Sequence, residues 1–275
     1  MLRLLTIELY KLRFHRASLL LILAYFLLLT SIALIAAIKF DIGPIKFHLA
    51  EQGIFNFPFI WHFNTFVAAV LKFFLLLVIV SMMANEYSYV TLKQNLIDGL
   101  SKQEFILSKF YTVVLFALIS MVFVFIVSLV LGLFYSDFNE LSIIFSDLEY
   151  LVAYFVKLLG FFSFGLFLGI LVKRSAFAVG AMIIWSVGES IFKGLLRWYY
   201  KVDYELIMQF FPLESMSNLI KEPFTKLNAV QTVAKQVGED LTKDFSVHLS
   251  DLLIVILWTL FFIYLSYYIL KKRDL

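Results

Sequence analysis

Long apolar runs separated by short polar segments extend along most of the chain. Six of these runs have the length of about 20 mostly apolar residues that a transmembrane helix needs. They cover roughly residues 17–38, 59–84, 106–135, 148–172, 175–197 and 250–270. The pattern predicts an all-α, polytopic membrane protein with six transmembrane helices in a single domain over residues 1–275.

The first run follows several basic residues, as the apolar core of a secretory signal peptide does. Its apolar stretch is longer than the roughly 7–15 residues of such a core, and no convincing A-x-A cleavage site follows it. We therefore interpret the first run as a retained membrane helix.

The segment before the first run, residues 1–16, has the pattern of an amphipathic helix. Its leucines share one helical face, with the basic residues elsewhere: Leu2, Leu5, Leu9 and Leu12. A helix with an apolar face and basic side chains typically lies in the membrane–water interface. We predict an interfacial elbow helix at the N-terminus.

Polar residues are concentrated between the second and third runs. The segment 85–109 is helix-prone and carries several charges: Glu86, Lys93, Asp98, Lys102, Glu104 and Lys109. An ordinary solvated loop is the simplest interpretation of this segment, and a docking surface for another protein is the alternative.

The segment 198–249, before the last run, is partly apolar. Its stretch LIMQFFPLESMSNLI, residues 206–220, is too short to cross a membrane and too apolar for an open loop, so we predict a re-entrant or interfacial segment. After Pro223, apolar residues recur at three- and four-residue spacing, which predicts an amphipathic surface helix. They are Leu227, Val230, Val233, Val237 and Leu241.

Composition and charge agree with membrane insertion and indicate an orientation. The chain is 62% hydrophobic and 16% charged, against roughly 45–50% apolar and about 25% charged residues in soluble domains. Lys and Arg are frequent in 1–16, 85–109, 173–174 and 271–273 and absent from 136–147. The positive-inside rule then predicts cytoplasmic termini, a cytoplasmic 85–109 segment and an extracytoplasmic 198–249 segment, because long segments translocate with little regard for charge.

Several kinds of chemistry are excluded or unsupported. The chain has no cysteine, which excludes disulfides, thiolate nucleophiles and Cys-based metal sites. Its four histidines lie far apart, and neither nucleotide-binding glycine motifs nor HExxH or GxSxG occur. We expect no catalytic residue, metal site or cofactor in this chain. A membrane-embedded enzyme is the alternative, and no motif supports it.

Four charged residues fall inside the apolar runs and away from their ends: Lys72, Lys157, Glu189 and Lys193. A lysine at the centre of a membrane helix costs about 2.5–3.5 kcal/mol, so such residues usually face a partner or a wet cavity. With a rise of about 1.5 Å per residue, Glu189 and Lys157 lie roughly 9–14 Å from the outer ends of their runs, and Lys72 lies near the midplane. Glu189 could pair with Lys157, or with Lys193 four positions later. A polar translocation path and structural ion pairs both remain open.

The fourth run also contains a small-xxx-small pattern, formed by Gly165 and Gly169 in GLFLG. Such a pattern lets two membrane helices approach closely. We interpret it as a site of internal packing rather than as a dimer face.

Taken together, these features resemble the ABC-2 type permeases, the transmembrane subunits of one class of ATP-binding cassette transporters. The resemblance covers nearly the whole chain and includes an elbow with ELYKLR, the six runs, the polar insert, FPLESMSNLI before the last run and the terminal KKRDL. In that family the insert often has an acidic residue, a Gly-Thr pair, a Ser-Arg pair and a Lys that enters the third span. The matching positions are Glu86, Thr91, Ser101 with Lys102, and Lys109. Two positions depart from the pattern, Val90 in place of Gly and Lys102 in place of Arg.

The resemblance implies that 85–109 holds a coupling helix, which seats in a groove of a separate ATPase subunit. It implies two ABC ATPase subunits that bind ATP and Mg, a second permease copy or paralogue, a surrounding lipid bilayer and no nucleic acid. The implied location is the bacterial cytoplasmic (inner) membrane, and the implied activity is transport, with export favoured. The alternative is a membrane binding or immunity protein, or a channel, without active coupling.

Overall fold

The computed structural model describes residues 2–37, 40–42, 45–47, 53–138, 140–200, 204–227, 230–231 and 244–273. The longer helices are α1 (Leu2–Phe14), α2 (Arg16–Ala37), α3 (Phe59–Leu71), α4 (Phe73–Ser88), α6 (Lys102–Tyr135), α8 (Glu149–Val172), α9 (Ser175–Leu195) and α13 (Leu249–Lys272). The short ones are α5 (Thr91–Ile97), α7 (Leu141–Ile144), α10 (Tyr204–Met208) and α11 (Pro212–Asn218), with a π turn at Leu196–Tyr200 and a 3-10 turn at Phe224–Lys226. Two strands that were not predicted, β1 (Phe40–Ile42) and β2 (Ile45–Phe47), pair antiparallel.

The apolar runs form the long helices, because a backbone in lipid must satisfy its N–H and C=O groups within the segment. Within the described ranges, five helices are long and apolar enough to cross a membrane, and the bent pair α3–α4 makes a sixth if it is one span. The prediction of a helical protein with membrane-spanning apolar helices is confirmed, as far as the length and composition of the helices are concerned. The 34 residues of α6 correspond to about 50 Å, more than the roughly 30 Å of a hydrocarbon core.

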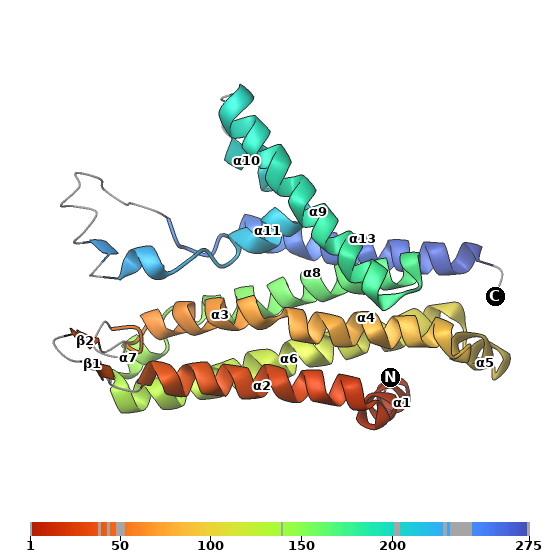
Figure 1. Ribbon diagram of the computed structural model, residues 1–275, viewed down its shortest axis with the longest axis horizontal. Coiled ribbons are helices and arrows are strands. Elements are labelled where there is room, and N and C mark those ends of the chain that lie inside the picture. The colour runs from red at the N-terminus through yellow and green to blue at the C-terminus, as the bar shows by residue number, and fades with distance from the viewer. Residues whose placement is uncertain are drawn as a thin grey trace.

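Figure 1 shows how the helices are arranged. The helices α1 and α5 and the C-terminal end of α13 lie at one end of the bundle, which we call the α5 end. The β1–β2 hairpin and α7 lie at the opposite end, the hairpin end. The helix α9 diverges from the other long helices toward α10 (Figure 1).

The second predicted span is broken at Lys72, where α3 and α4 meet at an angle of 42°. No proline or glycine lies at the break. The ammonium group of Lys72 donates a hydrogen bond of 2.9 Å to the carbonyl of Ala69, which a straight helix pairs with the N–H of Phe73. A side chain that enters the backbone ladder is a recognised cause of helix kinks, and it accounts for a bend that the apolar pattern did not predict.

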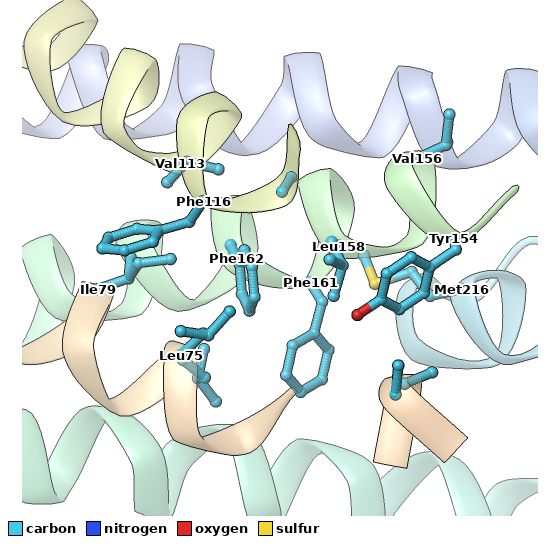
Figure 2. Close-up of a cluster of buried hydrophobic side chains, with 14 of the residues drawn as sticks. Leu75, Ile79, Val113, Phe116, Tyr154, Val156, Leu158, Phe161, Phe162 and Met216 are labelled. Carbon is cyan, nitrogen blue, oxygen red and sulfur yellow. The ribbon is translucent and has the colours of Figure 1, made fainter. Parts of the chain in front are cut away.

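The helix α8 is the centre of the bundle. In its most apolar 18-residue stretch 72% of the residues are buried, whereas the value is 17–33% in α2, α6, α9 and α13. It packs on α3, α4, α6, α9, α11 and α13. Figure 2 shows Phe162 of α8 between Leu75 of α4 and Val113 of α6. Most of the apolar surface of α8 is therefore covered by protein, although Val152 and Leu171 remain exposed.

Close approach of α8 to α4 depends on glycine. A methyl group at Gly165 would overlap the side chain of Leu76, and one at Gly169 would lie 3.2 Å from Cβ of Met83. Both neighbours belong to α4 of the same chain. The interpretation of GLFLG as a site of internal packing is confirmed.

The stretch predicted to be re-entrant forms α10 and α11, and α11 packs against α8, α9 and α13. Pro212 begins α11, where its fixed φ angle suits the first turn and its missing N–H costs nothing. The indole of Trp258 in α13 donates to the carbonyl of Phe210 at 2.9 Å and holds the turn before α11. Most of the amphipathic helix predicted after Pro223 lies outside the described residues.

A cluster of hydroxyl groups lies inside the bundle. Tyr25 of α2, Ser120 of α6 and Tyr154 of α8 are fully buried and bonded to one another, with 2.6 Å between the two tyrosine oxygens and 2.8 Å between Ser120 and Tyr154. Each hydroxyl both donates and accepts, so the three groups satisfy one another. This cluster was not predicted, and it joins three helices in one geometry.

Candidate functional site

Charged side chains from three helices meet at the α5 end. Glu8 and Lys11 come from α1, Glu86 from the last turns of α4, and Lys109 from the second turn of α6. We call these four residues the charge cluster. It lies beside the α4–α6 connection that contains α5.

Lys109 is the centre of the charge cluster. Its ammonium group is 2.6 Å from Oε2 of Glu8 and 2.5 Å from Oε1 of Glu86. Lys11 contacts the same oxygen of Glu86 at 2.7 Å. The other oxygen of Glu86 accepts a 2.6 Å hydrogen bond from the hydroxyl of Thr91 at the start of α5. Glu86 therefore binds α1, α5 and α6 at once.

The cluster is buried and formally neutral. Glu8, Glu86 and Lys109 are 3%, 2% and 0% exposed, and Lys11 supplies the second positive charge. Removing one member of a buried ion pair leaves an uncompensated charge and typically costs about 3–5 kcal/mol. The cluster therefore fixes how α1 and the α4–α6 connection are placed relative to each other.

The remaining insert residues have other partners. The hydroxyl of Ser101 caps α6 by accepting from the N–H of Glu104 at 3.2 Å, while the Glu104 carboxylate accepts from the N–H of Ser101 at 2.9 Å. This reciprocal capping box satisfies N–H groups that the first turn leaves unpaired. Lys102 donates to the carbonyls of Lys271 and Arg273 at 3.3 and 2.9 Å. Of the predicted coupling residues, Glu86, Thr91 and Lys109 are brought together, whereas Ser101 and Lys102 form the junction of α6 with the end of α13.

Sequence reasoning missed Glu8 and Lys11. It placed Leu9 and Leu12 on one apolar face of the helix, yet Leu9 is 40% exposed, whereas Leu12 and Glu8 are buried. Glu8 and Leu12 are four positions apart and share the face of α1 that meets the bundle. An acidic residue one turn before Leu12 was the available signal, but it had no visible partner because Lys109 lies 101 positions away in the chain.

A second group of charged residues lines a cavity of about 480 Å³ between α9, α11, α8 and the α3–α4 break. Lys72, Lys157 and Glu189, predicted from three different runs, all contribute to its wall. We call it the lysine cavity. Its volume lies within the range of about 300–1,000 Å³ that is common for small-molecule pockets.

The two ion pairs considered for Glu189 do not form among the described residues. The Glu189 carboxylate accepts from the indole of Trp185 at 2.6 Å and from the N–H groups of Leu213 and Glu214 at 3.2 and 2.9 Å. Lys193 instead pairs with Glu214 at 2.5 Å. The N–H groups that begin α11 are unpaired within that helix and favour an anion, so Glu189 holds α11 against α9.

The lysines of the cavity have few partners. Lys157 is 5% exposed and donates to the carbonyls of Ser217 and Ile220, each at 3.4 Å, near the end of α11. Lys72 bonds only to the carbonyl of Ala69 and lies over the ring of Phe161, with 4.5 Å from Nζ to the centroid. In the part of the chain that the structure describes, neither lysine has a carboxylate within ion-pair distance.

No group of three or more His, Cys, Asp or Glu side chains within the described ranges is placed to hold a metal ion. The two sites therefore offer ammonium, carboxylate and backbone groups for binding and positioning.

The sequence was also compared with known proteins. The profile of a family described as "Protein of unknown function (DUF2705)" matches residues 32–275. The chain belongs to the DUF2705 family. The match includes the lysine cavity, Glu86 and Lys109, whereas Glu8 and Lys11 precede it. No curated protein matches the chain.

Proposed function

We propose that this protein is the membrane-spanning subunit of an ABC-2 type transporter, in which a separate ATPase drives movement of the helices. The charge cluster is the observation that carries the proposal. A subunit driven from outside needs a rigid connection between the surface that is pushed and the helices that move, and the cluster joins the α5 segment to α1, α4 and α6.

The exposed part of α5 is the proposed docking surface for the ATPase. Ile97 is 73% exposed and Lys93 and Asp98 are exposed beside it, whereas Leu92 is buried against the bundle. An apolar side chain surrounded by charged ones is a common composition for the centre of a protein interface. In this arrangement the α5 end is cytoplasmic, two ATPase subunits bind two permease chains, and export is the favoured direction.

The test is co-purification of the tagged full chain from its native host, with bound chains identified by mass. We expect a roughly stoichiometric ATPase with Walker motifs. Ile97→Arg should lower the amount of bound ATPase by about tenfold or more, because an interface centre contributes most of the binding free energy. Leu141→Arg is the matched control, since Leu141 is 72% exposed on α7 at the hairpin end.

Glu86 is a less suitable target for this test. Because it is buried in the charge cluster, its replacement changes folding as well as any coupling. If the folded chain is recovered at normal yield without a Walker-type ATPase, the proposal is wrong. Equal loss of the ATPase in the Ile97 and Leu141 variants would exclude α5 as the docking surface.

A further inference from the structure

The lysine cavity contains two positively charged side chains without an ion-pair partner among the described residues. These two lysines line one partly open cavity, and two acidic residues near them are already engaged. Glu189 accepts three hydrogen bonds from Trp185, Leu213 and Glu214, and the Glu214 carboxylate is paired with Lys193. The cavity is therefore left with two ammonium groups, Lys72 and Lys157, that lack a negative partner among its described residues.

Much of the rest of the wall is apolar, Ser186, Ser190 and Ser217 add polar groups to it, and the cavity is partly open. Phe73, Phe161, Ile183, Val187 and Met216 line it. Ile183 and Val187 are 53% and 52% exposed, and they belong to α9, the helix that diverges from the other long helices (Figure 1). A ligand with an apolar part could therefore lie along α9, with its polar end at the lysines.

We propose that the lysine cavity binds an amphiphile with a phosphate or carboxylate head, which Lys72 and Lys157 contact, and an apolar tail, which lies along Phe161, Ile183 and Val187. The same chemistry is offered by the headgroup of an anionic lipid and by a free anionic amphiphile. If the amphiphile is the transported substrate, this inference rests on the proposed transport function. The binding site itself does not depend on that function.

Charge and placement favour an anion over a cation or a neutral ligand. A lysine inside a membrane protein is retained at a cost of a few kcal/mol and usually faces a partner or a wet cavity. Within the described residues, the polar contacts of Lys157 are two long ones to carbonyl oxygens, both 3.4 Å. Hydrogen bonds from ammonium to phosphate or carboxylate are shorter and stronger than such contacts, so an anionic head supplies what the cavity lacks.

The test is equilibrium binding of radiolabelled dodecyl phosphate to the purified full chain in maltoside micelles. We expect one saturable site per chain. Lys72→Met should raise the Kd about tenfold or more, as loss of one charge-assisted hydrogen bond predicts. Lys72→Arg keeps the charge and should stay within about threefold of the original Kd. Lys272→Met, which removes an exposed lysine at the end of α13, is the control and should change nothing.

Competition with unlabelled ligands distinguishes an anionic lipid from a free anionic amphiphile as the bound molecule. Displacement by phosphatidylglycerol but not by dodecylphosphocholine supports a site for anionic lipid, and displacement by neither supports a free anionic amphiphile. Equal displacement by inorganic phosphate overturns the role of the tail, and equal displacement by dodecylphosphocholine overturns the role of the charge. An unchanged Kd in Lys72→Met overturns the site itself.

Lys72 is the preferred target because it is more exposed than Lys157. Its ammonium group also holds the α3–α4 break through the hydrogen bond to Ala69, so the loss is assigned to the missing charge only if Lys72→Met keeps the unfolding midpoint of the original chain. Binding is measured without an ATPase. Failure of this inference is therefore separate from failure of the transporter proposal, which is judged by co-purification.

Discussion

Val90 connects α4 and α5 through a backbone conformation that valine rarely adopts. Its φ of 58° and ψ of 15° lie in the left-handed region, where a Cβ atom crowds the carbonyl oxygen at a cost of roughly 1–2 kcal/mol. β-Branched residues are rarer still in this region. The turn that brings Thr91 to Glu86 is thus built on a strained residue, and it explains why glycine suits this position in the permeases that the insert resembles.

Val90→Gly should raise the free energy of unfolding by about 1 kcal/mol, because glycine adopts this conformation without a steric penalty. Thermal unfolding of the detergent-solubilised chain measures the change. Lys93→Gly is the control, since Lys93 is exposed inside α5, where glycine costs up to about 1 kcal/mol. A lower unfolding midpoint for Val90→Gly would contradict the interpretation that the turn is strained.

Side-chain partners were predictable only where two residues are close in the sequence or a resemblance connects them. The resemblance grouped Glu86, Thr91 and Lys109, which lie together in the structure. The pairing of Glu189 with a lysine was wrong, because its donors include the backbone N–H groups of Leu213 and Glu214. Every residue except proline carries such an N–H group, so the side-chain pattern gives no indication of which N–H groups lack a partner within their helix.

At the scale of the elements, the long helices follow directly from the apolar runs. The predicted run 17–38 becomes α2 at Arg16–Ala37, and 148–172 becomes α8 at Glu149–Val172. The break at Lys72 and the β1–β2 hairpin could not be predicted in this way, since hydropathy reports where a segment is apolar and not how its backbone bonds are arranged.

Packing of α4 on α8 gives a prediction about Gly165. Gly165→Ala should lower the free energy of unfolding by about 1–3 kcal/mol, because its methyl group overlaps Leu76 in a filled interior. Gly188→Ala in α9 meets nothing within 4 Å and should be neutral or stabilising by up to about 1 kcal/mol. Both are measured by thermal unfolding. Leu76→Ala should partly restore the Gly165 variant; the absence of any restoration would show that these two helices do not meet there.

At the scale of the whole molecule, the arrangement predicts which surfaces share a side of the membrane. The exposed positions Lys93 and Lys272 lie at the α5 end, whereas Leu141 lies at the hairpin end. The chain has no cysteine, so one introduced cysteine reports its own position without a background.

Single variants Lys93→Cys, Lys272→Cys and Leu141→Cys are to be labelled with a membrane-impermeant maleimide. We expect the first two to react in inside-out vesicles and the third in intact cells, in agreement with the distribution of Lys and Arg. Reaction of Lys93→Cys and Leu141→Cys from the same side would contradict the proposed orientation.

The central position of α8 has a consequence for how the protein is made. Synthesis proceeds from the N-terminus, and segments begin to fold as they emerge. The helices α2, α4 and α6 are complete before α8 exists, yet α4 and α6 bury their inner faces against it, and Tyr25 and Ser120 need Tyr154 to complete their hydrogen bonds. In a nascent chain that ends before Glu149, the faces of α2, α4 and α6 that later contact α8 are therefore uncovered, and part of that surface is polar. Insertion of the early helices and closure of the core are therefore separate events, and the core closes only after the fourth apolar run has been inserted.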